Sequence, residues 1–276
     1  LAPADKKLYS IRDIVGTVES LPLITSSILS KKIASGLSSL VLDVKVGNGS
    51  FNSTIDIARD LSNSLVRVAK GAGLHCEAIL TDMNQVLGKS AGHTLEILEC
   101  IKYIKNDFKD HRLEKITNEL ISSLLVNIYK ISKEEAYNKI NTVINNGLAA
   151  EKFEMMVAAL GGPKNILTSY EKDLTNTSIQ KDIFSIEGGW IENIHTRELG
   201  LILIELGGGR KQVTDKINYG VGYDNVLNIG DEVNSSTPLL SLYSSKNIDN
   251  NLINKIKGCF IISDKKTQKL PEIFET

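Results

Sequence analysis

The sequence predicts an α/β protein: part of an all-helical domain, then a mixed or parallel-sheet α/β domain, then a small C-terminal β-rich α+β domain. Three observations support this prediction. A strand, an amphipathic helix and a second strand follow one another between residues 39 and 81, and helical patterns fill residues 93–160. After about residue 180, short apolar runs alternate with Gly and Asp/Asn turns. We place the three parts at residues 1–35, 36–180 and 181–276.

The first part is predicted to be mainly helical. Residues 9–18 are compatible with a helix or an irregular segment. A second helix then starts at Ser20-Leu21-Pro22, because Ser20 suits an N-cap and Pro22 suits a first turn, where its missing N–H costs nothing. The pattern continues from Leu23 to Ala34, and Gly36 is a suitable C-terminal stop.

A parallel βαβ unit is predicted next. Ser39–Val46 is typical of a buried strand, Ile55–Ala69 of an amphipathic helix closed by Gly71, and His75–Thr81 of a second strand. Such a unit has a right-handed crossover, and ligands bind beyond the carboxyl ends of its strands. The residues at those ends are Asp43, Lys45, Gly47, Thr81, Asp82, Met83 and Asn84.

Four helices are predicted after this unit. They are His93–Asn106, Leu113–Tyr129, Lys133–Asn146 and Ala149–Leu160, the last ended by Gly161-Gly162-Pro163.

Composition narrows the function classes. The hydrophobic content of 42% and the charged content of 24% are those of an ordinary globular protein. A net charge of -1 gives no overall field to attract nucleic acid or an acidic membrane, and no apolar stretch approaches the ~18 residues that span a bilayer. We therefore expect neither nucleic acid nor membrane as a partner.

Cysteine and histidine usage argues against a disulfide framework and a zinc site. The three cysteines (Cys76, Cys100 and Cys259) are far apart and odd in number, which favours a reduced, cytoplasmic setting. The four histidines are not spaced as metal ligands, so no metal site is expected from them.

The candidate site consists of Arg12, Ser27 and Lys31. Ser27 and Lys31 are four residues apart on the predicted helix and therefore share a face. With Arg12 they would offer hydrogen-bond donors to a carbonyl-bearing ligand that becomes anionic. The alternative is an exposed arginine beside a solvated helix face, which is the common situation for such residues.

Several stretches in order along the chain resemble the thymidine phosphorylases, members of the pyrimidine nucleoside phosphorylase family that share a fold with anthranilate phosphoribosyltransferase. The stretches are Tyr9-x-x-Arg12-Asp13, Ser20–Lys32, Leu42–Phe51, Leu80–Gly88, Met155-Met156-Val157 before Gly161-Gly162, and Leu206–Arg210. The Ser20–Lys32 block is the most specific of them.

The resemblance implies roles for these residues. The matching Arg, Ser and Lys of the family hold the pyrimidine ring, so Arg12, Ser27 and Lys31 would bind substrate. Arg12 and Lys31 would also be catalytic, because cationic donors stabilise the charge that develops on the leaving base. Tyr9, Ile24 and Phe51 would line an apolar slot for the ring, although a plain core role remains open for each.

The resemblance also implies an activity: reversible phosphorolysis of thymidine to thymine and 2-deoxy-D-ribose 1-phosphate. Such an enzyme is a pentosyltransferase, a glycosyltransferase of pyrimidine salvage, with phosphate as co-substrate and no organic cofactor. Family members dimerise through the helical domain, so a homodimer is expected. Some relatives bind potassium at positions matching Leu87, Ser90 and Glu99, but a surface position on a helix is the simpler explanation of Glu99, and no cofactor is expected.

The family's phosphate-binding Lys-His-Ser stretch and glycine-rich loop have no match here. By the resemblance, the chain corresponds to the C-terminal two-thirds of the enzyme, and we expect it to be inactive alone. The glycines near Lys45 and in Gly207-Gly208-Gly209-Arg210 suggest phosphate loops only weakly, and turns explain them as well.

Two other functions are compatible with the same fold. Phosphoribosyl transfer to an aromatic amine is disfavoured by Arg12, Ser27 and Lys31. A catalytically silent dimerisation module of the same fold is the main alternative. Whether uridine is accepted is not decided by the sequence.

Overall fold

The computed structural model describes residues 2–14, 20–174, 179–212 and 214–275. These residues form two compact units. The first unit comprises Leu1–Asp82, Ile116–Tyr137 and Glu272–Thr276, and the second comprises Met83–Lys115 and Asn138–Pro271. The three domains predicted from the sequence divide the chain differently, and they stay a prediction.

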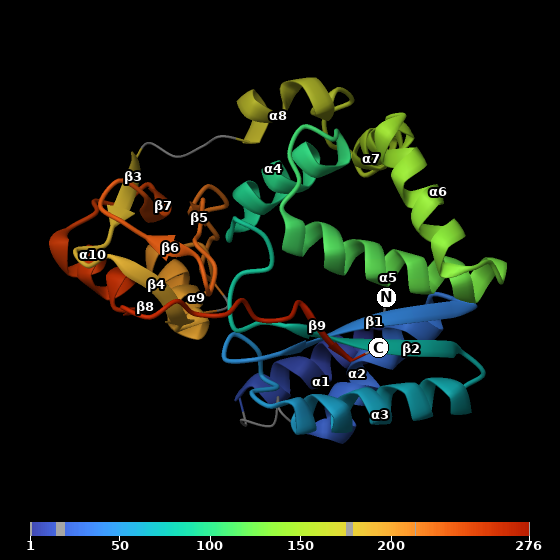
Figure 1. Cartoon of the computed structure of the whole chain (residues 1–276). Helices are drawn as coiled ribbons and strands as arrows, with labels where there is room; N and C mark the ends of the chain where they lie inside the picture. Colours follow the sequence, from blue (N-terminus) through green and yellow to red (C-terminus); the bar gives the residue numbers. More distant parts are fainter. Residues whose placement is uncertain (1, 15–19, 175–178, 213, 276) are drawn as a thin grey trace. The chain divides into compact units, whose positions relative to one another are not determined.

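The helices follow the chain as labelled in Figure 1. The first unit contains α1 (Pro3–Ile14), α2 (Leu21–Ala34) and α3 (Ile55–Gly71). The second contains α4 (His93–Ile104), α7 (Leu148–Ala159), α8 (Ile166–Leu174), α9 (Thr196–Leu206) and α10 (Asn250–Lys257). Two helices, α5 (His111–Tyr129) and α6 (Lys133–Asn145), contribute residues to both units. Of the helices described, none combines the length and apolar character needed to cross a membrane.

Three small sheets are present among the described residues. One has the order β1–β2–β9, from Ser39–Val46, His75–Asp82 and Ile273–Glu275. Another has the order β3–β7–β5, from Ile179–Phe184, Pro238–Ser244 and Gly222–Asp224. The last has the order β6–β4–β8, from Glu232–Val233, Gly189–Ile194 and Phe260–Ser263. The α/β composition predicted from the sequence is confirmed.

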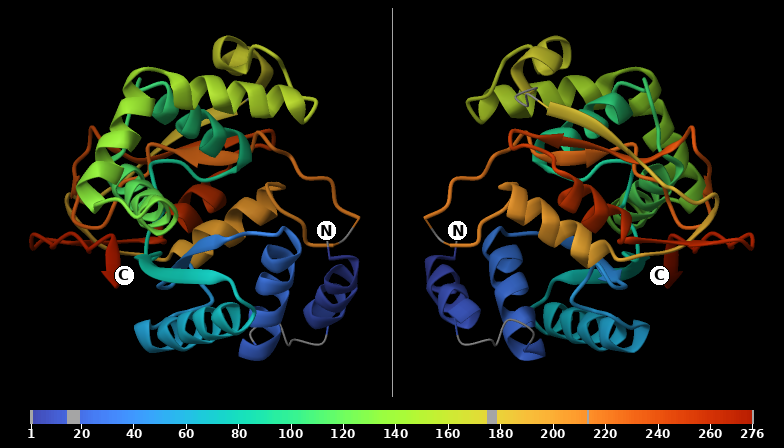
Figure 2. Two further views of the ribbon diagram at one scale, coloured as in Figure 1. Left: turned by 90° about the vertical axis from the view of Figure 1, so that its right-hand side faces the viewer. Right: turned by 90° about the vertical axis from the view of Figure 1, so that its left-hand side faces the viewer.

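The first unit is built around the predicted βαβ element. Strands β1 and β2 pair in parallel from Ser39 opposite His75 to Val46 opposite Asp82. Leu40, Val44 and Val46 point to one face, where they pack with the apolar stripe of α3 and with Leu29 of α2. Figure 2 shows α2 between α1 and α3. This core fixes α2, and α2 carries two of the three candidate site residues.

Helix α2 starts and ends where the sequence predicts, but its predicted N-cap makes no side-chain hydrogen bond. Ser20 occupies the N-cap position with extended backbone, and Pro22 lies in the first turn. The Ser20 side chain makes no capping hydrogen bond, however. Gly36 follows the C-cap with φ of +69°, a left-handed conformation that glycine adopts without steric cost. Residues 15–18 of the predicted 9–18 segment lie outside the described residues.

The second unit holds the β-rich C-terminal part and its own core. Buried residues of strands and helices meet there, among them Ile191, Ile202, Tyr223 and Leu240. The apolar run 201–206 lies in the part of the chain predicted to be β-rich, but it belongs to helix α9. Its buried residues recur at helical spacing, and Gly207 closes the helix with φ of +102°.

Candidate functional site

Helices α1 and α2 bring three polar side chains of the first unit together. The ammonium of Lys31 lies 2.6 Å from Oδ2 of Asp5 and 2.9 Å from Oγ of Ser27. The Ser27 and Lys31 side chains meet across one turn of α2, as their spacing predicts. Asp5, in the first turn of α1, was not predicted as a site residue.

Arg12 lies on α1 and is 5% exposed. Its Nη1 donates to the carbonyl oxygen of Leu23 at 3.3 Å, which ties α1 to the first turn of α2. Its guanidinium carbon lies 5.5 Å from the ring centre of Tyr9, a cation–π geometry. The arginine is therefore held by both helices of the site.

The electrostatics of the site centre on Asp5. The Lys31 ammonium, which hydrogen-bonds its carboxylate, lowers the pKa of Asp5, and the Ser27 hydroxyl lowers it further through a second hydrogen bond. Arg12 contributes by charge attraction. Asp5 thus interacts with each of the three predicted base-binding residues, and it is the counter-ion of Lys31 and Arg12.

The three residues predicted to line an apolar slot lie in different surroundings. Tyr9 is 48% exposed and lies against Arg12. Ile24 is half-buried and packs against the core of the first unit. Phe51 is 63% exposed in the loop after β1. Tyr9 therefore joins the cationic cluster, and the slot role of Ile24 and Phe51 stays a prediction.

The strand ends of the βαβ unit carry a polar triangle. The Lys45 ammonium lies 2.6 Å from Oδ2 of Asp43 and donates to the Thr81 hydroxyl at 2.9 Å. That hydroxyl in turn donates to Asp43. The loop after Lys45 is closed by its own hydrogen bonds, and Gly47 has φ of +131°. The turn interpretation of this glycine is therefore sufficient.

In the second unit, the Glu99 carboxylate accepts hydrogen bonds from the loop that contains Lys89 and Ser90. It accepts from the backbone N–H of Lys89 at 2.8 Å and of Ser90 at 3.1 Å, and also from the Ser90 hydroxyl. Both oxygens therefore accept hydrogen bonds from the loop. The potassium site considered from the sequence stays a prediction.

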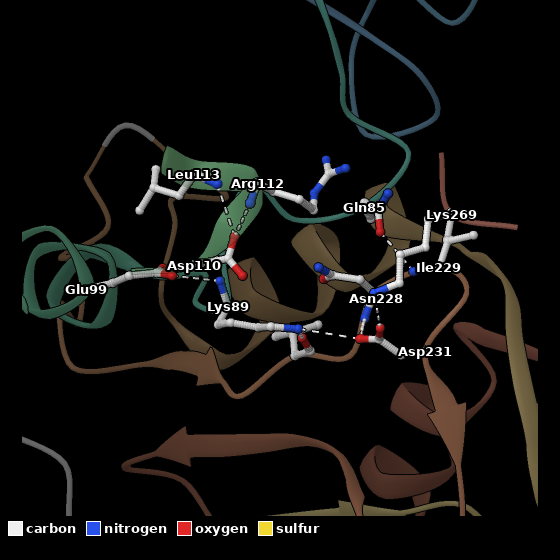
Figure 3. Close-up of polar contacts among 11 residues, drawn as sticks. Gln85, Lys89, Glu99, Asp110, Arg112, Leu113, Asn228, Ile229, Asp231 and Lys269 are labelled. Carbon is white, nitrogen blue, oxygen red and sulfur yellow. Dashed lines mark hydrogen bonds and ion pairs between the residues drawn. The ribbon is translucent and has the colours of Figure 1, made fainter. Parts of the chain in front are cut away.

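The same loop is tied to the C-terminal part of the second unit (Figure 3). Lys89 reaches Asp231 at 3.5 Å, and Lys269 reaches the other oxygen of Asp231 at 3.1 Å. Burial would raise the pKa of Asp231, but the Asn228 N–H and the two lysines outweigh it and leave that pKa lowered. The Gln85 side chain also accepts from the N–H of Ile229 at 2.8 Å.

The second unit also contains a cavity of about 740 Å³. Its wall includes Lys102, Phe108, Tyr170, Asp224 and Tyr243, and none of Arg12, Ser27 or Lys31 borders it. No group of three His, Cys, Asp or Glu side chains that could hold a metal ion occurs in the described part of the chain.

Comparison with known proteins assigns the chain to a family. Residues 1–150, more than half of the chain, match the family model described as "Glycosyl transferase family, a/b domain". The chain belongs to this glycosyl transferase family. A second model, "Pyrimidine nucleoside phosphorylase C-terminal domain", matches residues 190–263. The boundary predicted near residue 180 precedes that match.

One curated relative in this glycosyl transferase family is a thymidine phosphorylase from Colwellia psychrerythraea strain 34H. It is 43% identical over 276 residues, which is 99% of this chain and 63% of the relative. The chain therefore spans less than two-thirds of the length of that relative. Both the family assignment and the relative agree with the resemblance found in the sequence.

Proposed function

We propose that this chain supplies the pyrimidine-binding part of a thymidine phosphorylase, a pentosyltransferase that converts thymidine and phosphate reversibly to thymine and 2-deoxy-D-ribose 1-phosphate. One observation carries the proposal: Arg12, Ser27 and Lys31, the three predicted base-binding residues, all interact with the single carboxylate of Asp5 in the first unit. The 43% identity to the Colwellia thymidine phosphorylase supports the choice of substrate.

The chemistry of the cluster suits this reaction. When phosphate displaces the base at C1′ of the sugar, the leaving pyrimidine acquires negative charge on its carbonyl oxygens and ring nitrogens. Lys31 and Arg12 are cationic donors, so they stabilise this charge more than they stabilise the neutral substrate. Removing one such donor costs about 3 kcal/mol, or roughly 100-fold in rate.

Binding of the free base tests the proposal. The chain should bind thymine in calorimetric titrations, and Lys31→Ala should abolish that binding at millimolar thymine. Lys32→Ala is the matched control, because Lys32 is the adjacent lysine on α2 and should leave thymine affinity unchanged. Equal losses in the two variants, or no thymine binding by the wild-type chain, would contradict a base site at Lys31.

A dimerisation module that binds no base is the second candidate. Exposed apolar residues on α1 and α2 favour an interface there: Leu8, Ile11, Leu21, Leu23 and Ile33. A base site and an interface are compatible, since Ser27 is buried whereas these apolar residues are exposed. We propose a homodimer through these helices as part of the function.

The cellular setting is proposed from the thiols. Burial raises the pKa of Cys76, and it raises the pKa of Cys259 to about 11, so both thiols are protonated near neutral pH. All three cysteines are unpaired. These features support a reduced, cytoplasmic setting. We propose a role in pyrimidine salvage from the proposed reaction alone.

We further propose that the reaction uses phosphate as co-substrate and no other cofactor. The Glu99 contacts support a structural role for that carboxylate in place of potassium binding.

A further inference from the structure

The hydrogen-bond directions around Ser27 follow from the chemistry of its partners. A carboxylate only accepts, so the Ser27 hydroxyl must donate its proton to Asp5. An ammonium only donates, so Ser27 Oγ must accept from Lys31 at 2.9 Å. Asp5 therefore fixes the orientation of a hydroxyl group that would otherwise rotate to suit any ligand.

This arrangement leaves a defined set of groups for a ligand. Lys31 has three N–H donors, and the contacts among the described residues use two of them, to Asp5 Oδ2 and Ser27 Oγ. Its side chain is 42% exposed, so the third donor is accessible. Ser27 Oγ has two lone pairs, and Lys31 uses one of them. The site therefore presents a hydrogen-bond donor beside an acceptor.

A pyrimidine with an imide edge matches this pattern. Thymine and uracil carry a ring N–H between two carbonyl oxygens, so the N–H can donate to Ser27 while a neighbouring oxygen accepts from Lys31. Cytosine has an unprotonated ring nitrogen and an exocyclic amino group at the corresponding edge. Its ring nitrogen would face the Ser27 lone pair, and its amino group would face a cation.

We propose that Asp5 is a positioning residue that sets the hydrogen-bond polarity of the base site and thereby selects imide pyrimidines over cytosine. The proposal rests on the proposed function, because it assumes that Ser27 and Lys31 contact the base. It adds a determinant of specificity from α1, the helix whose first turn holds Asp5.

The competing explanation is that Asp5 merely ties α1 to α2 through an ion pair with Lys31. Asp5→Asn distinguishes the two. The asparagine keeps the size of the side chain, and its carbonyl oxygen still accepts from Lys31. Its amide group donates, however, so Ser27 can now accept from it and turn its own proton toward the ligand.

The experiment measures the affinities of thymine and cytosine for the wild-type chain and for Asp5→Asn by titration calorimetry. The expected result is that wild type prefers thymine and that the thymine-to-cytosine affinity ratio falls roughly tenfold to a hundredfold in the variant, because thymine loses one hydrogen bond to Ser27 while cytosine gains one. Because both bases bind the same folded molecules, the ratio is insensitive to partial unfolding.

Two further variants act as controls. Asp56→Asn removes another aspartate of the first unit that pairs with a cation, Arg59 at 2.8 Å, and should keep the wild-type ratio. Asp5→Glu retains a carboxylate and should restore most of the preference for thymine.

The outcomes separate this inference from the proposed function. If wild type prefers thymine and Asp5→Asn keeps that preference, the inference is overturned and the proposed function stands. If Asp5→Asn binds thymine more tightly than wild type, Asp5 competes with the ligand and the inference is likewise overturned. If wild type binds neither base at millimolar concentration, both the proposed function and the inference fail.

Discussion

At the scale of single residues, the space around a glycine decides what a methyl group would do there. A Cβ on Gly88 would overlap the Glu99 carboxylate, the group that holds the backbone N–H of Lys89 and Ser90. Gly200 lies inside α9, where nothing is within 4 Å of an added Cβ. The same substitution should therefore have opposite effects at the two sites.

Gly88→Ala should lower the free energy of unfolding by about 1–3 kcal/mol, because Glu99 must move and loses its backbone partners. Gly200→Ala should raise it by about 0.5–1 kcal/mol, because alanine restricts the unfolded chain and favours the helix. Equilibrium denaturation measures both. Destabilisation by both variants would show that the Glu99 contacts do not explain the effect at Gly88.

Arg12, Ser27 and Lys31 were predicted from a family resemblance carried by local sequence blocks, and their binding of a base stays a prediction. Asp5 could not be predicted, since an acidic residue near a helix start is explained by the helix dipole alone. Its partner Lys31 lies 26 positions away, and only the packing of α1 on α2 joins them. Contacts between elements, rather than patterns within one element, therefore bring Asp5 to Lys31.

At the scale of elements, helix starts differ in how well they are capped. Asp249 caps α10 by accepting from the N–H of Leu252 at 2.8 Å. Ser20 occupies the same position of α2 without a side-chain hydrogen bond. A suitable residue type at an N-cap therefore predicts where the helix starts, but does not establish that the capping bond is made.

Asp249→Ala should cost about 1 kcal/mol of stability, because a backbone N–H loses its acceptor. Ser20→Ala should cost clearly less, since no capping bond is lost. Hydrogen exchange at the first turns of α10 and α2 locates each effect. An equal loss of protection in both helices would mean that Ser20 caps α2 in solution.

Elements with long, regular patterns were predicted well. Strand β1 has the predicted bounds, and α4 to α7 lie within two residues of the predicted helices. Helix α8 and strand β9 were not predicted, because nine and three residues carry too little periodicity. The partners of β9 also lie far away in the sequence, so local patterning holds no signal for its pairing.

At the scale of the whole molecule, the exposed apolar residues of α1 and α2 form the surface through which we propose that two copies of the chain dimerise. Leu8 is 57% exposed and Ile11 is 55% exposed, and both lie on α1. A charge in a dimer interface is costly, because it loses water without gaining a partner.

The double variant Leu8→Asp/Ile11→Asp should therefore shift the chain from dimer to monomer in sedimentation velocity. Ile186→Asp, at a 90% exposed apolar residue of the second unit, should leave the dimer unchanged. A wild-type chain that sediments as a monomer at every concentration would contradict the proposed dimer.

The position of strand β9 at residues 273–275 has a consequence for folding during synthesis. It pairs with β2, its Phe274 packs against the core of the first unit, and Arg59 of α3 binds Glu275 across 216 positions of sequence. During synthesis β1, α3 and β2 emerge long before residues 273–275. The edge of β2 that pairs with β9 therefore lacks this partner until translation has passed the entire second unit.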